Sequence, residues 1–214
     1  MTFSAKRYFE QKERKVLFMN LPNKLTILRI CMVPIFVVCL MLPNALGNED
    51  IKVPLYIVSA VVFFLSAVTD FADGKIARKY NLITNFGKFM DPLADKFMVI
   101  GALIASIYAF EEMRLWLVIT TIVVVFREFA VTSMRLVAVN AEHVVIAAAM
   151  PGKIKTFSQC IFIELLILEP MIFSFSDFFV TYRPLTYIFM AVVIFFTLYS
   201  GALYFKAYKK YITM

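Results

Sequence analysis

The chain has 214 residues, of which 62% are hydrophobic, and its mean hydropathy is +0.81. Soluble domains are about 45–50% apolar, so the composition excludes a soluble globular protein and predicts an integral membrane protein. We interpret the formal net charge of +7 as membrane topology and attraction to anionic lipid. It does not indicate nucleic-acid binding, because there is no soluble domain to carry a basic face.

The membrane-spanning elements are expected to be helices. Spanning strands would show a ten-residue alternation of apolar and polar residues, which the sequence lacks, and helices are the other way to satisfy the backbone in lipid. The sequence has no internal repeats or flexible linkers, which predicts one all-α domain. The cysteines lie in apolar runs without metal-ligand spacing, and His143 alone cannot form a metal site.

The chain divides into a basic N-terminal juxtamembrane segment, residues 1–19, and a six-helix transmembrane domain, residues 20–214. The first segment is either a helix on the membrane surface or a disordered tail. Apolar runs predict transmembrane helices near residues 25–42, 53–79, 85–110, 114–139, 151–169 and 184–206. The fifth has the least regular apolar pattern, because Ser158, Gln159 and Glu164 interrupt it.

The positive charges predict the orientation of these helices. With the N-terminus inside, the inner ends and loops hold 19 lysines and arginines, and the outer loops hold only Lys52, Arg114 and Arg183. Cytoplasmic segments carry the excess of basic residues. Both chain termini and the junction between the second and third helices are therefore expected on the cytoplasmic side.

Four aspartates flank that junction. Asp70 and Asp73 are three residues apart, and Asp91 and Asp95 are four apart, so each pair lies on one face of its helix. If the chain turns back near residues 80–85, the two pairs face each other. Asp70 lies 17 residues beyond Val53, about 25 Å along a helix, so this pocket is expected near the cytoplasmic interface.

Carboxylates at this density favour hard divalent cations, Mg²⁺ or Mn²⁺, and a binuclear site suits phosphoryl transfer. Gly74 and Gly87 lie one turn from Asp70 and Asp91 and leave room for a ligand, although close helix packing is the favoured explanation for either glycine taken alone. Arg78 is placed to meet a phosphate. The alternative is salt bridging to nearby basic residues, whose side chains can instead reach water; these are Lys75, Arg78, Lys88 and Lys96.

These residues form a pattern of eight fixed positions that resembles the signature of the CDP-alcohol phosphotransferase family. The pattern consists of Asp70, Asp73, Gly74, Ala77, Arg78, Gly87, Asp91 and Asp95. Three further stretches are similar to bacterial phosphatidylglycerophosphate synthases within that family. They are residues 20–26 with Arg29, residues 127–132 with Arg135, and residues 151–156.

The resemblance implies six transmembrane helices in the family fold, a homodimer, two divalent cations, and a location in the bacterial cell membrane. It implies that Asp70, Asp73, Asp91 and Asp95 bind the metals and that Asp95 is the general base. It also implies a binding site for CDP-diacylglycerol formed by Asn23, Thr26, Asp73, Gly74, Ala77, Arg78 and Gly87.

The expected acceptor is sn-glycerol 3-phosphate, a dianion that needs cations of its own. Arg127 and Arg135 lie within about 80° on the fourth helix, and Lys153 and Lys155 begin the fifth, where a helix N-terminus favours anions. Spacing of two residues means that both lysines cannot face the same way. Positive-inside topology is the alternative explanation for these four residues.

The expected reaction is therefore transfer of a phosphatidyl group from CDP-diacylglycerol to glycerol 3-phosphate, with release of CMP. Two alternatives remain open. One is the same chemistry with phosphatidylglycerol, inositol phosphate or serine as the acceptor. The other is a divalent-cation transporter, which predicts carboxylates near mid-membrane on broken helices.

Overall fold

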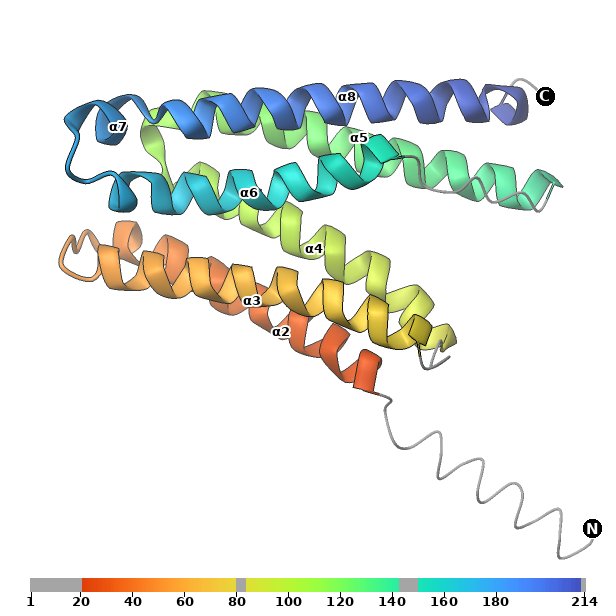
Figure 1. The fold of residues 1–214 in the computed structure, drawn as a ribbon, viewed down its shortest axis with the longest axis horizontal. Helices are drawn as coiled ribbons and strands as arrows, with labels where there is room; N and C mark the ends of the chain where they lie inside the picture. The colour runs from red at the N-terminus through yellow and green to blue at the C-terminus, as the bar shows by residue number, and fades with distance from the viewer. Residues whose placement is uncertain (1–20, 80–83, 143–149, 213–214) are drawn as a thin grey trace, which may run out of the picture.

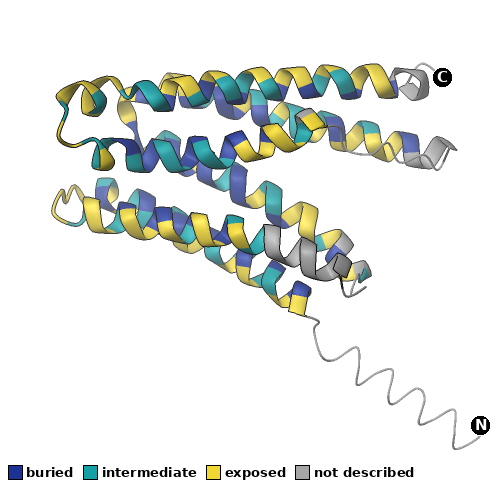
Figure 2. Ribbon diagram, viewed as in Figure 1, coloured by how far each residue is buried: buried dark blue, intermediate teal, exposed yellow. Residues whose placement is uncertain are grey.

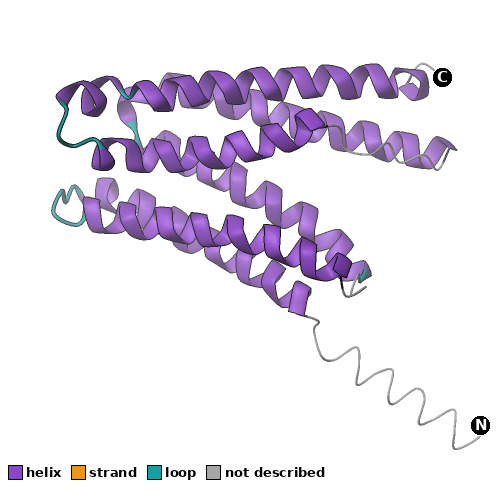
Figure 3. Ribbon diagram, in the orientation of Figure 1, coloured by secondary structure: helices purple, strands orange, loops and turns teal. Residues whose placement is uncertain are grey.

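The computed structural model describes residues 21–79, 84–142 and 150–212. These residues are mostly helical, and most of the described connecting loops lie at one end of the molecule (Figure 3). The elements are α2 (Leu21–Leu46), α3 (Lys52–Lys79), α4 (Asn85–Ala109), η1 (Glu111–Met113), α5 (Arg114–Glu142), α6 (Met150–Ile172), α7 (Asp177–Tyr182) and α8 (Pro184–Ile212). The predicted all-α class is confirmed. The basic segment 1–19 lies outside the described residues.

The helix ends differ from the sequence-based expectations at Pro43 and Pro170, which both lie inside helices in the structure. The first helix continues through Pro43 to Leu46, and it ends at Gly47, which has a φ of 61°. Glycine adopts this left-handed conformation without the Cβ penalty of other residues, so it terminates helices well. The last helix extends beyond the expected Lys206 to Ile212, and the short elements η1 and α7 were not predicted.

The helices form two groups joined by α4. In one group α2 packs against α3, and in the other α8 packs against both α5 and α6. Figure 1 shows α4 crossing obliquely between them. Ala94, Ala102 and Ala105 of α4 are fully buried, and small side chains let helices approach closely. At Gly101 an added Cβ would lie only 3.1 Å from Val33 Cγ1 of α2.

Buried residues line the inward faces of both groups, and exposed residues line the outward faces (Figure 2). The most buried large apolar side chains include Leu40, Phe63, Leu103, Leu117, Phe162 and Leu166. Many outward residues are also apolar, among them Phe64, Phe126 and Phe195. An apolar exterior of this kind suits contact with lipid.

Five helical segments among the described residues are long and apolar enough to cross a membrane, and they comprise α2 and parts of α3, α4, η1–α5 and α7–α8. The chain is therefore a multi-pass membrane protein. The remaining long helix, α6, contains two lysines, Lys153 and Lys155, and two glutamates, Glu164 and Glu169. The sixth predicted span, which α6 would supply, stays a prediction.

Glu169 has a structural role at the end of the bundle that holds most of the loops. Its side chain is fully buried. It accepts hydrogen bonds from the backbone N–H groups of Leu185 (2.9 Å) and Thr186 (2.7 Å). These donors belong to the first turn of α8, where helix N–H groups have no intrahelical partner. Glu169 therefore fixes the start of α8 against α6.

Candidate active site

Three of the four predicted metal-binding aspartates have described side chains, and they lie toward the end of the bundle where α3 ends and α4 begins, opposite most of the described loops (Figure 1). Asp70 lies on α3, and Asp91 and Asp95 lie on α4. Both helices are continuous through these residues. Asp73, Gly74, Ala77 and Arg78 occupy the last turns of α3, where the backbone is described and the side chains are not. Their expected roles stay predictions.

Arg29 of α2 joins two of these carboxylates. Its Nη1 lies 2.6 Å from Asp70 Oδ1 and 2.8 Å from Asp95 Oδ1. The Arg29 side chain is fully buried, whereas the two carboxylates are about half exposed. Breaking a buried ion pair by removing one partner is strongly destabilising, so Arg29 ties α2, α3 and α4 together at this level.

Two more polar residues of α2 contact α4 on the same side as Arg29. Thr26 Oγ1 donates to Asp91 Oδ1 at 2.7 Å, and Asn23 Oδ1 accepts from Thr84 Oγ1 at 3.0 Å. Asn23 and Thr26 are both buried. Their expected contact with the CDP-lipid stays a prediction. Thr26 already orients the Asp91 carboxylate, and Asn23 anchors the start of α4.

Gly87 lies close to both Asn23 of α2 and Thr84 at the start of α4. Thr84 caps α4, since its Oγ1 accepts from Gly87 N at 3.0 Å. A Cβ added at Gly87 would lie 3.1 Å from Asn23 Oδ1 and 3.7 Å from Asp91 Oδ2. A larger residue would therefore displace the Asn23 amide that holds α2 against α4. Close helix packing is therefore consistent with glycine at this position, and the expected contact of Gly87 with the CDP-lipid stays a prediction.

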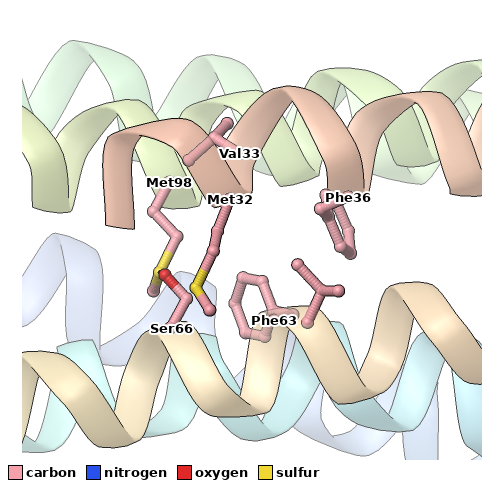
Figure 4. Close-up of a pocket in the computed structure, with 7 residues that line it drawn as sticks. Met32, Val33, Phe36, Phe63, Ser66 and Met98 are labelled. Carbon is pink, nitrogen blue, oxygen red and sulfur yellow. The ribbon is translucent and has the colours of Figure 1, made fainter. Parts of the chain in front are cut away.

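An apolar layer lies about one turn deeper than Arg29 and Asp95. Met32, Val33, Phe36, Phe63 and Met98 contribute to it, as Figure 4 shows, together with Ser66, whose Oγ lies 2.9 Å from Met98 Sδ. The cavity between them has a volume of only about 10 Å³, close to the minimum for one water molecule. Tightly packed apolar side chains therefore separate the carboxylates from the interior of the helix bundle.

A much larger cavity, of about 500 Å³, opens between α4, α5 and α6. Its lining residues are Asp91, Pro92, Asp95, Lys96, Val99, Ile100, Arg127, Glu128, Val131, Thr132, Arg135, Lys155, Thr156 and Gln159. We refer to it as the α4–α6 cavity. It brings together two of the predicted metal-binding carboxylates and three of the four predicted acceptor-binding cations.

Lys153 is the exception among those cations. It is exposed and is not among the residues that line the cavity, whereas Lys155 is 4% exposed. Side chains two residues apart are separated by about 200° around the helix axis, which places them on nearly opposite faces. Lys155 therefore faces inward and Lys153 faces outward. Arg127 and Arg135 both line the cavity, in agreement with their spacing on one face of α5.

Glu128 holds the inward cations in place. Its Oε1 accepts a hydrogen bond from Arg127 Nη1 at 2.9 Å and also forms an ion pair with Lys155 Nζ. The Arg127 guanidinium lies 5.5 Å from the centre of the Tyr204 ring on α8, within the range of a cation–π contact. Arg127 and Lys155 are therefore fixed by their neighbours and are not mobile surface charges.

Several cavity residues were not predicted as site residues from the sequence. Lys96 was considered only as a salt-bridge partner, yet its Nζ donates to Thr132 Oγ1 at 2.6 Å on the cavity wall. Glu128 and Thr132 lie within a stretch used only for the family resemblance. Gln159 was noted as an interruption of the fifth helix. A polar residue within an apolar helix was the available signal for it.

The donor chemistry of the site fits hard divalent cations. Two carboxylates, from Asp70 and Asp95, already converge on one positively charged group, the guanidinium of Arg29, and oxygen ligands suit Mg²⁺ and Mn²⁺. Among the side chains that the structure describes, no three acidic, histidine or cysteine residues lie close enough to hold an ion. Asp73, the remaining expected ligand, is outside that set.

The chain is similar to known proteins over most of its length. The family model for CDP-alcohol phosphatidyltransferase matches residues 19–199. The chain is 43% identical over 192 residues to the CDP-diacylglycerol–glycerol-3-phosphate 3-phosphatidyltransferase of Bacillus subtilis, covering 87% of this chain and 94% of the relative. It is 35% identical over 196 residues to the protein of the same name from Rickettsia felis, covering 90% and 97%. The chain therefore belongs to the CDP-alcohol phosphatidyltransferase family.

Proposed function

We propose that this protein transfers the phosphatidyl group of CDP-diacylglycerol to sn-glycerol 3-phosphate, giving phosphatidylglycerol phosphate and CMP. The observation that carries this proposal is the α4–α6 cavity, whose wall holds Asp91 and Asp95 together with Arg127, Arg135 and Lys155. Carboxylates suited to metal-assisted phosphoryl transfer thus share one space with cations suited to a phosphate. The names of the similar proteins support the same two substrates.

The proposed CDP-lipid site lies at the facing ends of α3 and α4. Asp70, Asp73, Asp91 and Asp95 would hold two divalent cations, Mg²⁺ or Mn²⁺, and Arg78 would contact the diphosphate. When bound, such cations neutralise charge on the transferring phosphoryl group. Arg29 and Thr26 orient Asp95 and Asp91 from α2, which preorganises carboxylates that would otherwise repel each other.

In the proposed reaction Asp95 accepts the proton of the acceptor hydroxyl. The hydroxyl oxygen forms a bond to the phosphorus that carries diacylglycerol, and the bond from that phosphorus to the CMP oxygen breaks. A general base must lie within hydrogen-bond reach of the proton it takes. Asp95 lines the cavity, and its bond to Arg29 restricts the direction in which its carboxylate points.

The acceptor phosphate would bind on the opposite wall of the cavity. Arg127 and Lys155 are held by Glu128, and Arg135 lies two turns further along α5. Charge-assisted hydrogen bonds from such groups are stronger than neutral ones. Lys153, which faces outward, is left out of the proposed acceptor site.

We place the site on the cytoplasmic side of a bacterial cell membrane. The support is the distribution of charge, with 19 of the 22 lysines and arginines on the predicted inner side, and the bacterial origin of the similar proteins. The homodimer expected from the family resemblance also remains a proposal.

The transporter alternative has little structural support. It requires broken helices at the carboxylates, whereas α3 and α4 continue through Asp70, Asp91 and Asp95. The cavity within the apolar layer next to these carboxylates has a volume of only about 10 Å³, which leaves little space for an ion to pass.

Release of CMP tests the proposed reaction. Purified protein is incubated with CDP-diacylglycerol, Mg²⁺ or Mn²⁺ and, in separate reactions, glycerol 3-phosphate, phosphatidylglycerol, inositol phosphate or serine. We expect CMP release with glycerol 3-phosphate. Release with another acceptor and none with glycerol 3-phosphate would reject the acceptor assignment and keep the reaction class.

A further inference from the structure

Gln159 is a buried polar residue of the α4–α6 cavity that the mechanism above does not use. It lies on α6, four residues beyond Lys155, and its side chain is 2% exposed. Its Nε2 is buried and has no hydrogen-bond partner within the part of the chain that the structure describes. Buried polar groups in proteins nearly always have a partner, so a partner from outside the chain is expected for this amide.

Several other polar side chains around the cavity have a bonded partner within the described residues, although Arg127 Nε is buried without one, like Gln159 Nε2. The bonded pairs or groups are Lys155 and Arg127 with Glu128, Lys96 with Thr132, Asp91 with Thr26, Asp95 with Arg29, and Thr156 with the backbone of Gly152. Gln159 is a neutral amide, and it can both donate and accept a hydrogen bond. It therefore suits a neutral hydroxyl group better than a phosphate or a metal.

The position of Gln159 along α6 fits one particular hydroxyl of the acceptor. Four residues correspond to about 6 Å along the helix and to nearly the same face. Gln159 therefore lies one turn from the proposed phosphate contact Lys155, in the direction of the bundle interior. Glycerol 3-phosphate has its phosphate at one end, its reacting primary hydroxyl at the other, and a secondary hydroxyl between them.

We propose that Gln159 binds the secondary hydroxyl of the acceptor and thereby selects a phosphorylated diol over an acceptor that lacks this group. The proposal rests on the proposed function, since it assumes glycerol 3-phosphate in the α4–α6 cavity. An ordered water is the other partner that a buried amide takes. If the partner of the Gln159 amide is the secondary hydroxyl, removing that hydroxyl from the substrate should slow the reaction. If the partner is a water molecule, its removal should have little effect.

The experiment compares two acceptors in the full-length protein with CDP-diacylglycerol and Mg²⁺. The first is glycerol 3-phosphate, and the second is 3-hydroxypropyl phosphate, which keeps the phosphate, the chain length and the primary hydroxyl. The value of kcat/KM for each acceptor is obtained from CMP release. We expect the unmodified protein to prefer glycerol 3-phosphate by about 10- to 100-fold, because the analogue leaves the amide without its partner.

Gln159→Leu is the test variant, and Ser158→Ala is the matched control. Ser158 is adjacent on α6 and buried, but it bonds to the backbone of Lys155 and does not line the cavity. In Gln159→Leu we expect kcat/KM for glycerol 3-phosphate to fall about 10- to 100-fold, while the value for 3-hydroxypropyl phosphate stays within about threefold. The preference then disappears, whereas Ser158→Ala keeps it.

The melting temperature provides a check on folding. Replacing an unpaired buried amide by an apolar side chain of similar size is expected to leave the stability unchanged or raised. An equal loss with both acceptors, or a preference that survives in Gln159→Leu, would overturn the proposal. If the unmodified protein uses neither acceptor, the proposed function fails and this inference with it. If it uses both equally well, only the inference fails.

Discussion

Lys155 of α6 and Glu128 of α5 form an ion pair on the wall of the same cavity that Asp95 lines. The oxygen of Glu128 that contacts Lys155 also accepts a hydrogen bond from Arg127. The proposed acceptor site therefore contains an anion as well as cations. Glu128 keeps two buried positive groups close together. Its negative charge also reduces the positive potential that attracts a phosphate.

Glu128→Gln should lower the stability of the protein and increase its response to phosphate. The variant keeps a hydrogen-bond acceptor but leaves Arg127 and Lys155 without their counter-charge, and breaking a buried pair costs about 3–5 kcal/mol. Inorganic phosphate should then raise the melting temperature of the variant by more than it raises that of the unmodified protein, because phosphate supplies the missing negative charge.

The matched control for this experiment is Glu111→Gln. Glu111 pairs with Arg114 at 2.7 Å, but both side chains are at least half exposed, and surface pairs contribute little to stability. The control should melt like the unmodified protein. If phosphate stabilises Glu128→Gln and the unmodified protein equally, Glu128 does not oppose anion binding.

Arg127→Ala should raise the KM for glycerol 3-phosphate by about 10- to 100-fold, as expected when a charged hydrogen-bond donor is lost. The KM for CDP-diacylglycerol should change much less. Lys153→Ala is the matched control, since it removes a nearby positive charge that faces away from the cavity. A larger effect on the KM of the lipid than on that of the acceptor would contradict the acceptor site.

Arg29→Ala should lower the melting temperature of the protein, and Mn²⁺ should restore part of this decrease. The variant leaves Asp70 and Asp95 facing each other without the guanidinium between them. Both carboxylates are about half exposed. We therefore expect the free energy of unfolding to fall by less than it does when a fully buried pair is broken, which is about 3–5 kcal/mol. Melting temperatures with and without Mn²⁺ measure both effects.

The control for Arg29 is Lys52→Ala, which removes an exposed pair with Glu49. Its melting temperature should stay close to that of the unmodified protein in both conditions. An Arg29→Ala variant that melts normally would show that the contacts of Arg29 with Asp70 and Asp95 do not hold the three helices together.

Asp95→Asn should reduce turnover by at least about 10²-fold, as is typical when a general base is lost, while CDP-diacylglycerol binding is largely kept. The amide can still accept a hydrogen bond from Arg29, so the local packing should persist. Single-turnover CMP release and equilibrium binding of the lipid separate the two effects. Equal loss of turnover and lipid binding would point to a metal-binding role without proton transfer.

The helical fold and the location of the carboxylates followed from local features of the chain. Apolar runs and their breaks predicted helices near α3 and α4, and the spacing of the aspartates on those helices predicted that each pair shares a face. Such features depend on neighbours a few residues apart. The end of the first helix was misjudged at Pro43 because the capping conformation of Gly47 decided it.

The sequence by itself therefore determined an all-α membrane protein with aspartates on its second and third helices, because composition and helical periodicity are properties of short segments. Only the tertiary structure decided which groups Arg29 and Glu128 contact and that Gln159 is buried at the cavity. Arg29 meets Asp95 across 66 positions of the chain, and Glu128 meets Lys155 across 27. Which way a side chain points from its helix depends on how that helix packs against others, and spacing within one helix cannot specify this.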